Sequence, residues 1–389
     1  MKIKKAMAFA ASAAIIFALT GCESISKPTS VPTIVISGTS EESGDTSSIE
    51  STPAESVSET SSSVSDTSSA DTSSVTSSDT TASKPEVTGN NEKGEMSGNI
   101  LVCNDGRGIV LFGGGTGETY ANALNQLAKK VGAGTKVNVF SMIIPTSGSF
   151  YMPENFGMAS EWDAIQNVNS QLQGIIPVDA YTALSKHTDE EIYARTDHHW
   201  MQLGAYYAAE EFVKTAQIDV PFTPISEYER HEIEGYLGTL YGYSNENALM
   251  AQHPETFTYY VAPNDFATYY MNPTDTDFTR NSMFVEQPVS CSYSTFMGGD
   301  EKVVHVTTDV TNGRKLLIIK DSYPNALVPC LTGSFEEIWT VDMRYLEEMQ
   351  HFPTSISKIV KDYGITDVLF CMDTFSAVGE NANHLAGII

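Results

Sequence analysis

Basic residues are scarce in this chain. Lysine and arginine together number 22 against 49 aspartates and glutamates, so the 389 residues carry a formal net charge of −27 at pH 7. The part from residue 98 to the end holds 36 acidic and 16 basic residues, a net of −20. A body this acidic repels polyanions, so we expect no nucleic-acid partner and no basic patch for an anionic membrane.

Cysteines are also few, and none stands in a C-x-x-C pair. Without such pairs a structural zinc site is not expected. Export would permit disulfides, but the sequence does not choose among the three full pairings of the last four cysteines or none. The five cysteines are Cys22, Cys103, Cys291, Cys330 and Cys371.

The apolar run near the N-terminus is short. Residues 6–20 are too few for a comfortable transmembrane helix. The run follows three lysines and ends in Leu-Thr-Gly-Cys at residues 19–22, which is typical of a signal peptide. Small residues before a cysteine are also the pattern of a bacterial lipobox, in which the thiol of Cys22 is acylated. We expect a lipoprotein signal peptide over 1–22 and a lipid-anchored protein in the cell envelope, at the extracellular face of the membrane. A simple secretory peptide is the alternative.

Residues 23–97 offer almost nothing that a folded core could bury. The segment consists mainly of Ser, Thr and acidic residues, and its 13 acidic and 3 basic residues give a net charge of −10. Such a composition cannot offset the entropy of folding, so we expect a disordered linker. Self-repulsion should extend it beyond the roughly 50 Å r.m.s. length of a flexible chain of this size.

Strand-like and helix-like patterns alternate over residues 98–389, which we expect to form one catalytic domain. The alternation predicts an α/β fold with a mostly parallel central sheet covered on both faces. Residues 222–312, rich in Tyr, Thr, Asn and Pro, break the pattern and predict an irregular, β-containing insertion beside the active edge of the sheet. We expect strands at 108–112, 136–145, 176–178, 314–322, 337–342 and 365–373, and helices at 118–131, 160–175 and directly after the 314–322 strand.

Ser322 stands where a parallel sheet places its sites. In LLIIKDSYPNALVPCL (316–331) it follows an apolar strand and precedes a helical pattern. Backbone N–H groups at the start of a helix can stabilise an oxyanion there. Asp or Ser before Pro also caps ordinary helices, so the turn alone is compatible with a structural role.

An acid, two histidines and a tryptophan stand together in YARTDHHWMQLGAYYAAEEFVK (193–214). A serine nucleophile needs a base, and the base needs a third group that fixes its tautomer. Asp197 and His199 are two residues apart, so both can point the same way and form that pair. In one alternative, Asp197 caps the helix that begins near Met201. In another, Asp197, His198 and His199 bind zinc or manganese. Adjacent histidines tend to diverge and no H-x-x-x-H companion is present, so we expect no metal.

The segments YARTDHHW, LLIIKDSYPN, FSMIIPTSGSFYMP and TVDMRYL resemble those of the DHHW proteins, exported bacterial proteins named for the tetrapeptide. These in turn are similar to the SGNH-hydrolase-like domains of the alginate O-acetylation proteins. The resemblance covers most of 98–389 and implies an SGNH-hydrolase-like three-layer sandwich. It also implies a triad in which Asp197 orients, His199 is the general base and Ser322 is the nucleophile. The implied chemistry is transfer of an acetyl group to or from a polysaccharide hydroxyl.

Four residues are candidates for substrate binding. Arg344 follows the 337–342 strand and suits an anionic group, or forms a surface salt bridge. Tyr241 lies in GYLGTLYGYS (235–244), whose tyrosines suit sugar stacking or burial. Trp200 lines the pocket or is buried, and Tyr323 adjoins the serine.

Three polar or flexible positions at other predicted turns are weaker candidates. Thr146 and Ser147 follow a strand and could donate to the oxyanion, although a polar turn explains them equally well. The glycines of FGGGTGE (112–118) indicate a tight turn, because the Lys-Ser/Thr of a phosphate-binding loop is lacking.

Two functions from different classes follow. The first is a lipid-anchored extracellular serine esterase or O-acetyltransferase that acts on a cell-envelope or secreted polysaccharide through an acyl-enzyme, without a cofactor. The second is a catalytically inactive glycan-binding or polysaccharide-assembly accessory protein. Asp197, His199 and Ser322 together favour the first, because a binding module has no use for all three. An exported transferase has no acetyl-CoA, so we expect a membrane-bound acyl-donor partner.

Overall fold

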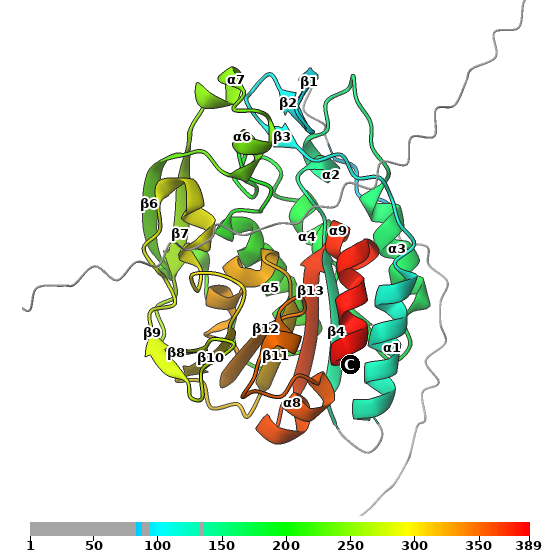
Figure 1. Cartoon of the computed structure of the whole chain (residues 1–389), viewed down its shortest axis with the longest axis vertical. Helices are drawn as coiled ribbons and strands as arrows, with labels where there is room; N and C mark the ends of the chain where they lie inside the picture. The colour runs from blue at the N-terminus through cyan, green and yellow to red at the C-terminus, as the bar shows by residue number, and fades with distance from the viewer. Residues whose placement is uncertain (1–82, 88–92, 133–135) are drawn as a thin grey trace, which may run out of the picture. The chain divides into compact units, whose positions relative to one another are not determined.

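An eight-stranded sheet forms the centre of the computed structural model, which describes residues 83–87, 93–132 and 136–389 (Figure 1). The signal peptide and most of the predicted linker lie outside these residues, as does Cys22. In spatial order, the first five strands run parallel and the last three are antiparallel to their neighbours. The order is β5 (Ile176–Pro177), β4 (Asn138–Ile144), β13 (Asp367–Asp373), β11 (Lys315–Lys320), β12 (Glu337–Asp342), β10 (Val303–Thr308), β8 (Phe266–Met271) and β9 (Thr279–Asn281).

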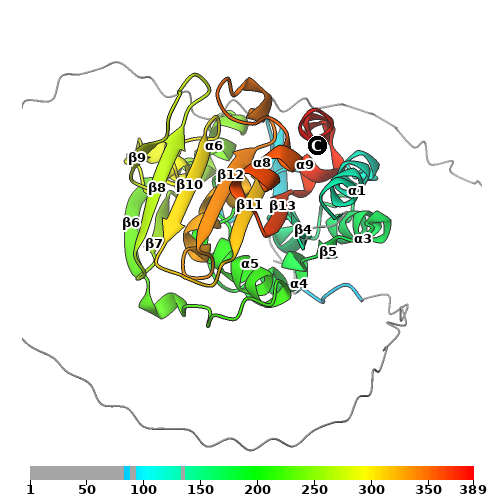
Figure 2. The ribbon, with the colours of Figure 1, turned by 90° about the horizontal axis from the view of Figure 1, so that it is seen from below.

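Helices cover both faces of the sheet, as alternate residues of β4 illustrate. Phe140 packs edge-to-face on Phe212 of α5 (Gln202–Thr215), whereas Ser141 shares a 2.9 Å hydrogen bond with Tyr120 of α1 (Glu118–Gly132). Helix α5 therefore lies on one face and α1 on the other (Figure 2). The predicted three-layer α/β fold with a mostly parallel sheet is confirmed. The α5 side holds α4 (Ala180–Ser185) and α5 (Gln202–Thr215), and the α1 side holds α1 (Glu118–Gly132), α3 (Glu161–Gln171), α8 (Ile356–Tyr363), α9 (Thr374–Val378) and α10 (Leu385–Ile388).

The apolar run at 108–112 does not join the central sheet, contrary to its prediction. Its first two residues form β3 (Gly108–Ile109), which pairs antiparallel with β2 (Ile100–Cys103). Strand β1 (Gly94–Ser97) completes this separate three-stranded sheet. A short apolar run can be recognised as a strand, but its partner is chosen by the rest of the fold.

The prediction of a helix directly after Ser322 was also wrong in the type of helix. Two 3₁₀ turns, η3 (Tyr323–Ala326) and η4 (Val328–Leu331), occupy its place. Pro329 lacks the N–H group that a continuous α-helix from Tyr323 would use at that position, so only short turns form. Pro324 lies in the first turn, where no N–H group needs an intrahelical partner.

Residues 222–312 differ in part from the expected insertion. Strands β8 to β10 belong to the central sheet, where β10 pairs with β12. The rest includes a separate hairpin of β6 (Glu229–Tyr236) and β7 (Glu255–Val261) and the segment η2 (Val289–Thr295). Helices α6 (Thr239–Tyr243) and α7 (Ala248–Ala251) lie between the hairpin strands in sequence. The remaining short helices are α2 (Gly148–Tyr151), η1 (Ile225–Glu227), η5 (Leu346–Glu348) and η6 (Glu380–His384).

None of the helices in the described part of the chain is both long enough and apolar enough to cross a lipid bilayer.

Candidate active site

The carboxyl ends of the parallel strands lie at one edge of the sheet. The DHHW segment, residues 193–200, packs against this edge. Ser322 follows the end of β11 by two residues. The hydroxyl of Tyr193 donates to the carbonyl of Pro145 after β4, and the indole of Trp200 donates to the carbonyl of Tyr323 at 2.8 Å. Residues 193–200 are thus held at two strand ends, which brings the two segments singled out in the sequence together.

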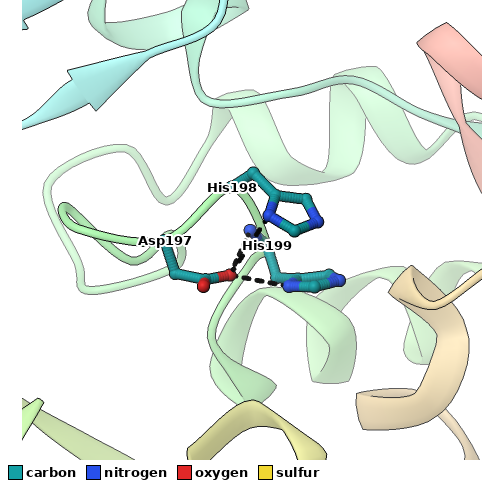
Figure 3. Close-up of side chains that lie close together, drawn as sticks. All are labelled: Asp197, His198 and His199. Atoms are coloured by element: carbon teal, nitrogen blue, oxygen red, sulfur yellow. Dashed lines mark hydrogen bonds and ion pairs between the residues drawn. The ribbon is translucent and has the colours of Figure 1, made fainter. Parts of the chain in front are cut away.

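A continuous hydrogen-bond chain joins Asp197, His199 and Ser322. Nδ1 of His199 lies 2.6 Å from Oδ1 of Asp197, and Nε2 lies 2.8 Å from Oγ of Ser322. The backbone N–H of His199 also donates to Oδ1 of Asp197 at 3.0 Å, which folds the acid back onto the base (Figure 3). Asp197 and His199 are buried, whereas Ser322 is partly exposed. A carboxylate on Nδ1 keeps the ring proton there and leaves the Nε2 lone pair for the serine hydroxyl.

Asp197 is held as an anion by groups from the 222–312 region. Thr239 donates to Oδ2 of Asp197 from its backbone N–H at 2.8 Å and from its hydroxyl at 2.9 Å. Burial alone raises the pKa of a carboxyl, but the neighbouring histidines and these hydrogen bonds hold the pKa of Asp197 well below its usual range. The capping alternative does not fit, because the residue that caps α5 is Met201 and no side chain bonds there.

His198 is neutral and takes no part in the hydrogen-bond chain of Asp197, His199 and Ser322. Its Nδ1 lies 2.7 Å from the hydroxyl oxygen of Thr239. The single proton of that hydroxyl goes to Asp197, so Nδ1 of His198 is the donor. Burial, together with the neighbouring His199, lowers the pKa of His198 to about 3. Its Nε2 is buried and has no hydrogen-bond partner among the described residues.

Asp197, His198 and His199 also form a group of potential metal ligands, whose ligand atoms lie within 4.8 Å of one another. Oδ1 of Asp197 is 2.6 Å from Nδ1 of His199 and 3.7 Å from Nδ1 of His198. Both Nδ1 atoms already hydrogen-bond, one to Asp197 and one to Thr239. An ion bound through them would have to displace both protons, so this geometry fits an acid–base pair better than a metal site.

Asp321 shapes the turn that carries Ser322. Its two carboxylate oxygens accept from the backbone N–H groups of Tyr323 and Asp373, each at 2.9 Å, so it links the ends of β11 and β13. Burial raises the pKa of Asp321. The hydroxyl of Tyr323 donates to the carbonyl of His198 and so joins this turn to the DHHW segment a second time.

Two residues that contact Asp197 or His199 were not predicted from the sequence. Thr239 lies in the 235–244 segment, in which the tyrosines are the residues that suggest sugar binding. Tyr293 of η2 lies flat against the ring of His199, with ring centroids 3.7 Å apart and planes 6° apart. Threonine and tyrosine are common throughout the sequence, so neither residue can be recognised as part of the site until the fold is known.

The sequence model of the family described as "DHHW protein" matches residues 33–341. The chain belongs to the DHHW family. A crystal structure of a DHHW family protein from Eubacterium siraeum is 46% identical, with a TM-score of 0.70, and the match covers 76% of this chain and 97% of that one. A search of curated proteins gave no match.

Two more distant solved structures also match. Bacillus cereus PatB1 with a sulfonyl adduct is 17% identical with a TM-score of 0.59, and the match covers 77% of this chain and 99% of PatB1. The O-acetyltransferase domain of Pseudomonas putida AlgJ is 13% identical with a TM-score of 0.40, over 74% of this chain and 93% of that one. PatB1 supports the SGNH-like fold of this DHHW protein; the AlgJ likeness is too weak to support an argument.

Arg344 of this DHHW protein lies in a buried group of ion pairs. Its Nε and Nη2 donate to Asp342 at 2.8 and 2.6 Å, and Nη2 also donates to Asp300 at 3.1 Å. Lys320 Nζ lies 3.1 Å from Asp300 and 3.4 Å from Asp342. Burial alone raises the pKa of Asp300, but Lys320 and Arg344 outweigh it and lower that pKa. An anionic substrate group would have to compete with two carboxylates for Arg344.

The other candidate binding residues take part in the packing of the protein. Trp200 and Tyr323 are buried, at 0% and 1% exposure, and hold the DHHW segment against the serine turn. Tyr241 is partly buried against a small apolar cluster that includes Leu240. Thr146 donates from its N–H and its hydroxyl to Glu161, at 2.9 and 2.6 Å, and the neighbouring Ser147 is buried.

Proposed function

We propose that this DHHW protein is a serine acyl-transfer enzyme, an O-acetyltransferase or esterase that acts on a cell-envelope or secreted polysaccharide. The observation that carries the proposal is the chain from Asp197 through His199 to Ser322. The PatB1 sulfonyl adduct supports it, because sulfonyl reagents add to activated nucleophiles and PatB1 shares this fold. We expect the same reagent class to modify Ser322.

The geometry gives each residue of the chain one task. His199 Nε2 takes the proton of Ser322 as its Oγ attacks the acyl carbonyl, and Asp197 stabilises the imidazolium that forms. The tetrahedral intermediate collapses to an acyl-serine, and His199 returns the proton to the leaving oxygen. A sugar hydroxyl or water then attacks the acyl-serine while His199 takes its proton, and His199 returns that proton to Oγ of Ser322 as the acyl–oxygen bond breaks. These steps require no cofactor.

Transferase and esterase differ only in the acceptor. A sugar hydroxyl accepts the acyl group in a transferase, and water accepts it in an esterase. An exported transferase needs a donor supplied across the membrane, and a membrane-bound acyltransferase partner would provide it.

The N-terminal sequence supports a lipid anchor at Cys22, with residues 23–97 as the tether to the domain. We therefore propose a location on the extracellular face of the cell membrane. Cys22→Ser should move the protein from the membrane fraction to the medium; retention in the membrane fraction would reject the anchor.

The decisive experiment measures acetate release by the full chain from p-nitrophenyl acetate and from an acetylated oligosaccharide, with and without chelator. Ser322→Ala and His199→Ala should each lower the rate at least about a thousandfold, because serine, base and acid act as one unit. Ser170→Ala, which removes an exposed serine on α3, is the matched control and should leave the rate unchanged.

Each other outcome identifies a different function. Release that requires a metal would make Asp197, His198 and His199 a ligand set. If no release or transfer is seen even with an oligosaccharide acceptor, and the folded protein still binds the glycan, the accessory role is correct.

A further inference from the structure

Tyr293 contacts both the base and the nucleophile's turn. Its ring is parallel to that of His199 at 3.7 Å between centroids, and its hydroxyl shares its one proton between the carbonyls of Ser322, at 3.1 Å, and Tyr323. The side chain is 6% exposed. It reaches the site from η2 in the 222–312 region, whereas His199 and Ser322 precede and follow that region in sequence.

The two faces of the His199 ring are covered differently. Tyr293 covers one face, and His198 lies at the other with ring centroids 3.8 Å apart and planes tilted by 38°. The proton that leaves Ser322 makes His199 an imidazolium. The electron-rich face of a tyrosine ring attracts a cation, and the neutral His198 adds no opposing charge.

The hydroxyl of Tyr293 has a separate role. The carbonyls of Ser322 and Tyr323 lie in the turn that Asp321 and Trp200 also hold. Because the hydroxyl bonds these carbonyls and belongs to the ring that covers His199, it fixes the position of the turn relative to His199. One rigid side chain therefore sets the distance between the base and the nucleophile.

We propose that Tyr293 is a positioning residue for acyl transfer, whose ring face holds the His199 imidazole and stabilises its protonated form, while its hydroxyl holds the Ser322 turn. This inference rests on the proposed function. It also gives the 222–312 region a second part in the site, besides the contact of Thr239 with Asp197.

The test is the rate at which phenylmethanesulfonyl fluoride labels the full chain, followed by intact mass. Labelling uses the same proton transfer, because Ser322 Oγ displaces fluoride and its proton passes to His199. Tyr293→Leu, which removes ring and hydroxyl, should label about tenfold more slowly than the unsubstituted chain. Tyr293→Phe keeps the ring face and loses only the hydroxyl's hold on the turn, which Asp321 and Trp200 share, so it should label about threefold more slowly.

Tyr270 provides a matched control in the same region. It is buried, and its hydroxyl donates to the carbonyl of Ser282 at 2.7 Å. Tyr270→Leu and Tyr270→Phe should label at the unsubstituted rate, and melting temperatures should separate lost folding from lost positioning. If Tyr293→Leu does not fold, Tyr293→Met, which fills more of the space without a π face, replaces it.

Three outcomes would overturn the inference, and they are distinguishable. Equal labelling of Tyr293→Leu and Tyr270→Leu would show that Tyr293 is structural only. A loss in Tyr293→Phe as large as in Tyr293→Leu would show that the ring face has no role. If the unsubstituted chain is not labelled at Ser322, the proposed function itself fails, and the positioning role fails with it.

Discussion

His198 is a partly buried histidine that lies between Asp197 and His199 in sequence but is not part of the hydrogen-bond chain from Asp197 through His199 to Ser322. It donates to the Thr239 hydroxyl, which in turn donates to Asp197. A proton added at Nε2 of His198 would charge a buried ring beside His199. The residue is therefore suited to a neutral, supporting role.

The pKa of His198 predicts how stability depends on pH. Its folded value of about 3 lies below the usual 6.5, so below pH 6.5 the unfolded chain binds a proton that the folded chain refuses. Stability should fall as pH decreases from 6.5 to 4.5, by at most about 1.4 kcal/mol per pH unit from this group. Thermal unfolding across this range should show a shallower fall for His198→Gln.

The exposed His384 supplies the control for this prediction. His384→Gln makes the same exchange but leaves His198 in place, so it should keep the pH dependence of the unsubstituted chain. If His198→Gln and the unsubstituted chain lose stability equally steeply, His198 is not the group that couples folding to protons.

The residues of the site differ in how far the sequence could predict them. Asp197, His199 and Ser322 are chemically reactive types at a strand end or in an unusual cluster, and the fold brings them into hydrogen-bond contact. Tyr293 and Thr239 have no such signal. Their contacts depend on how a region distant in sequence packs, which no local pattern encodes.

The start of helix α6 packs directly against the side chain of Asp197. Gly238 caps this helix, and a Cβ at Gly238 would lie 2.4 Å from Cβ and 2.5 Å from Oδ2 of Asp197. The backbone of Gly238 has φ −86° and ψ −163°, so an alanine there meets no backbone strain. Glycine is therefore required at 238 only because Asp197 lies so close to its Cα.

Gly238→Ala therefore tests the contact between α6 and Asp197. The added methyl should push the acid from His199, lower acetate release more than about tenfold and cost about 1–3 kcal/mol of stability. Gly242→Ala in the same helix is the matched control, because a Cβ there has no neighbour within 4 Å. Equal activity of the two variants would contradict this packing.

Secondary structure was predictable where the pattern was long or the strand was fully apolar. Strands β11, β12 and β13 lie within or match their predicted ranges, because parallel strands covered on both faces show as continuous apolar runs. The strand that pairs with β3 could not be predicted, because the pairing is long-range. The 3₁₀ turns after Ser322 were not predicted, because the apolar residues there have helical spacing although prolines interrupt the helix.

The charge of the whole molecule restricts which glycans can be substrates. Residues 98–389 carry a net of −20, and at the site Lys320 and Arg344 are paired with Asp300 and Asp342. An anionic polysaccharide would approach against the field of the body and then compete with two carboxylates for Arg344. A neutral glycan meets neither cost.

We therefore expect a neutral acetylated oligosaccharide to release acetate with a kcat/KM about tenfold above that of an acetylated uronic-acid oligosaccharide of equal length at about 10 mM salt. The difference should narrow near 150 mM, where the screening length falls from about 30 Å to about 8 Å, and the rate with uncharged p-nitrophenyl acetate should stay constant as the control for salt effects on the triad. If the uronic-acid substrate is instead faster at low salt and loses its advantage as salt is added, a local cation overrides the field of the body. Loss of that advantage in Arg344→Gln would then identify Arg344, released from Asp342 and Asp300, as the residue that binds the anionic sugar.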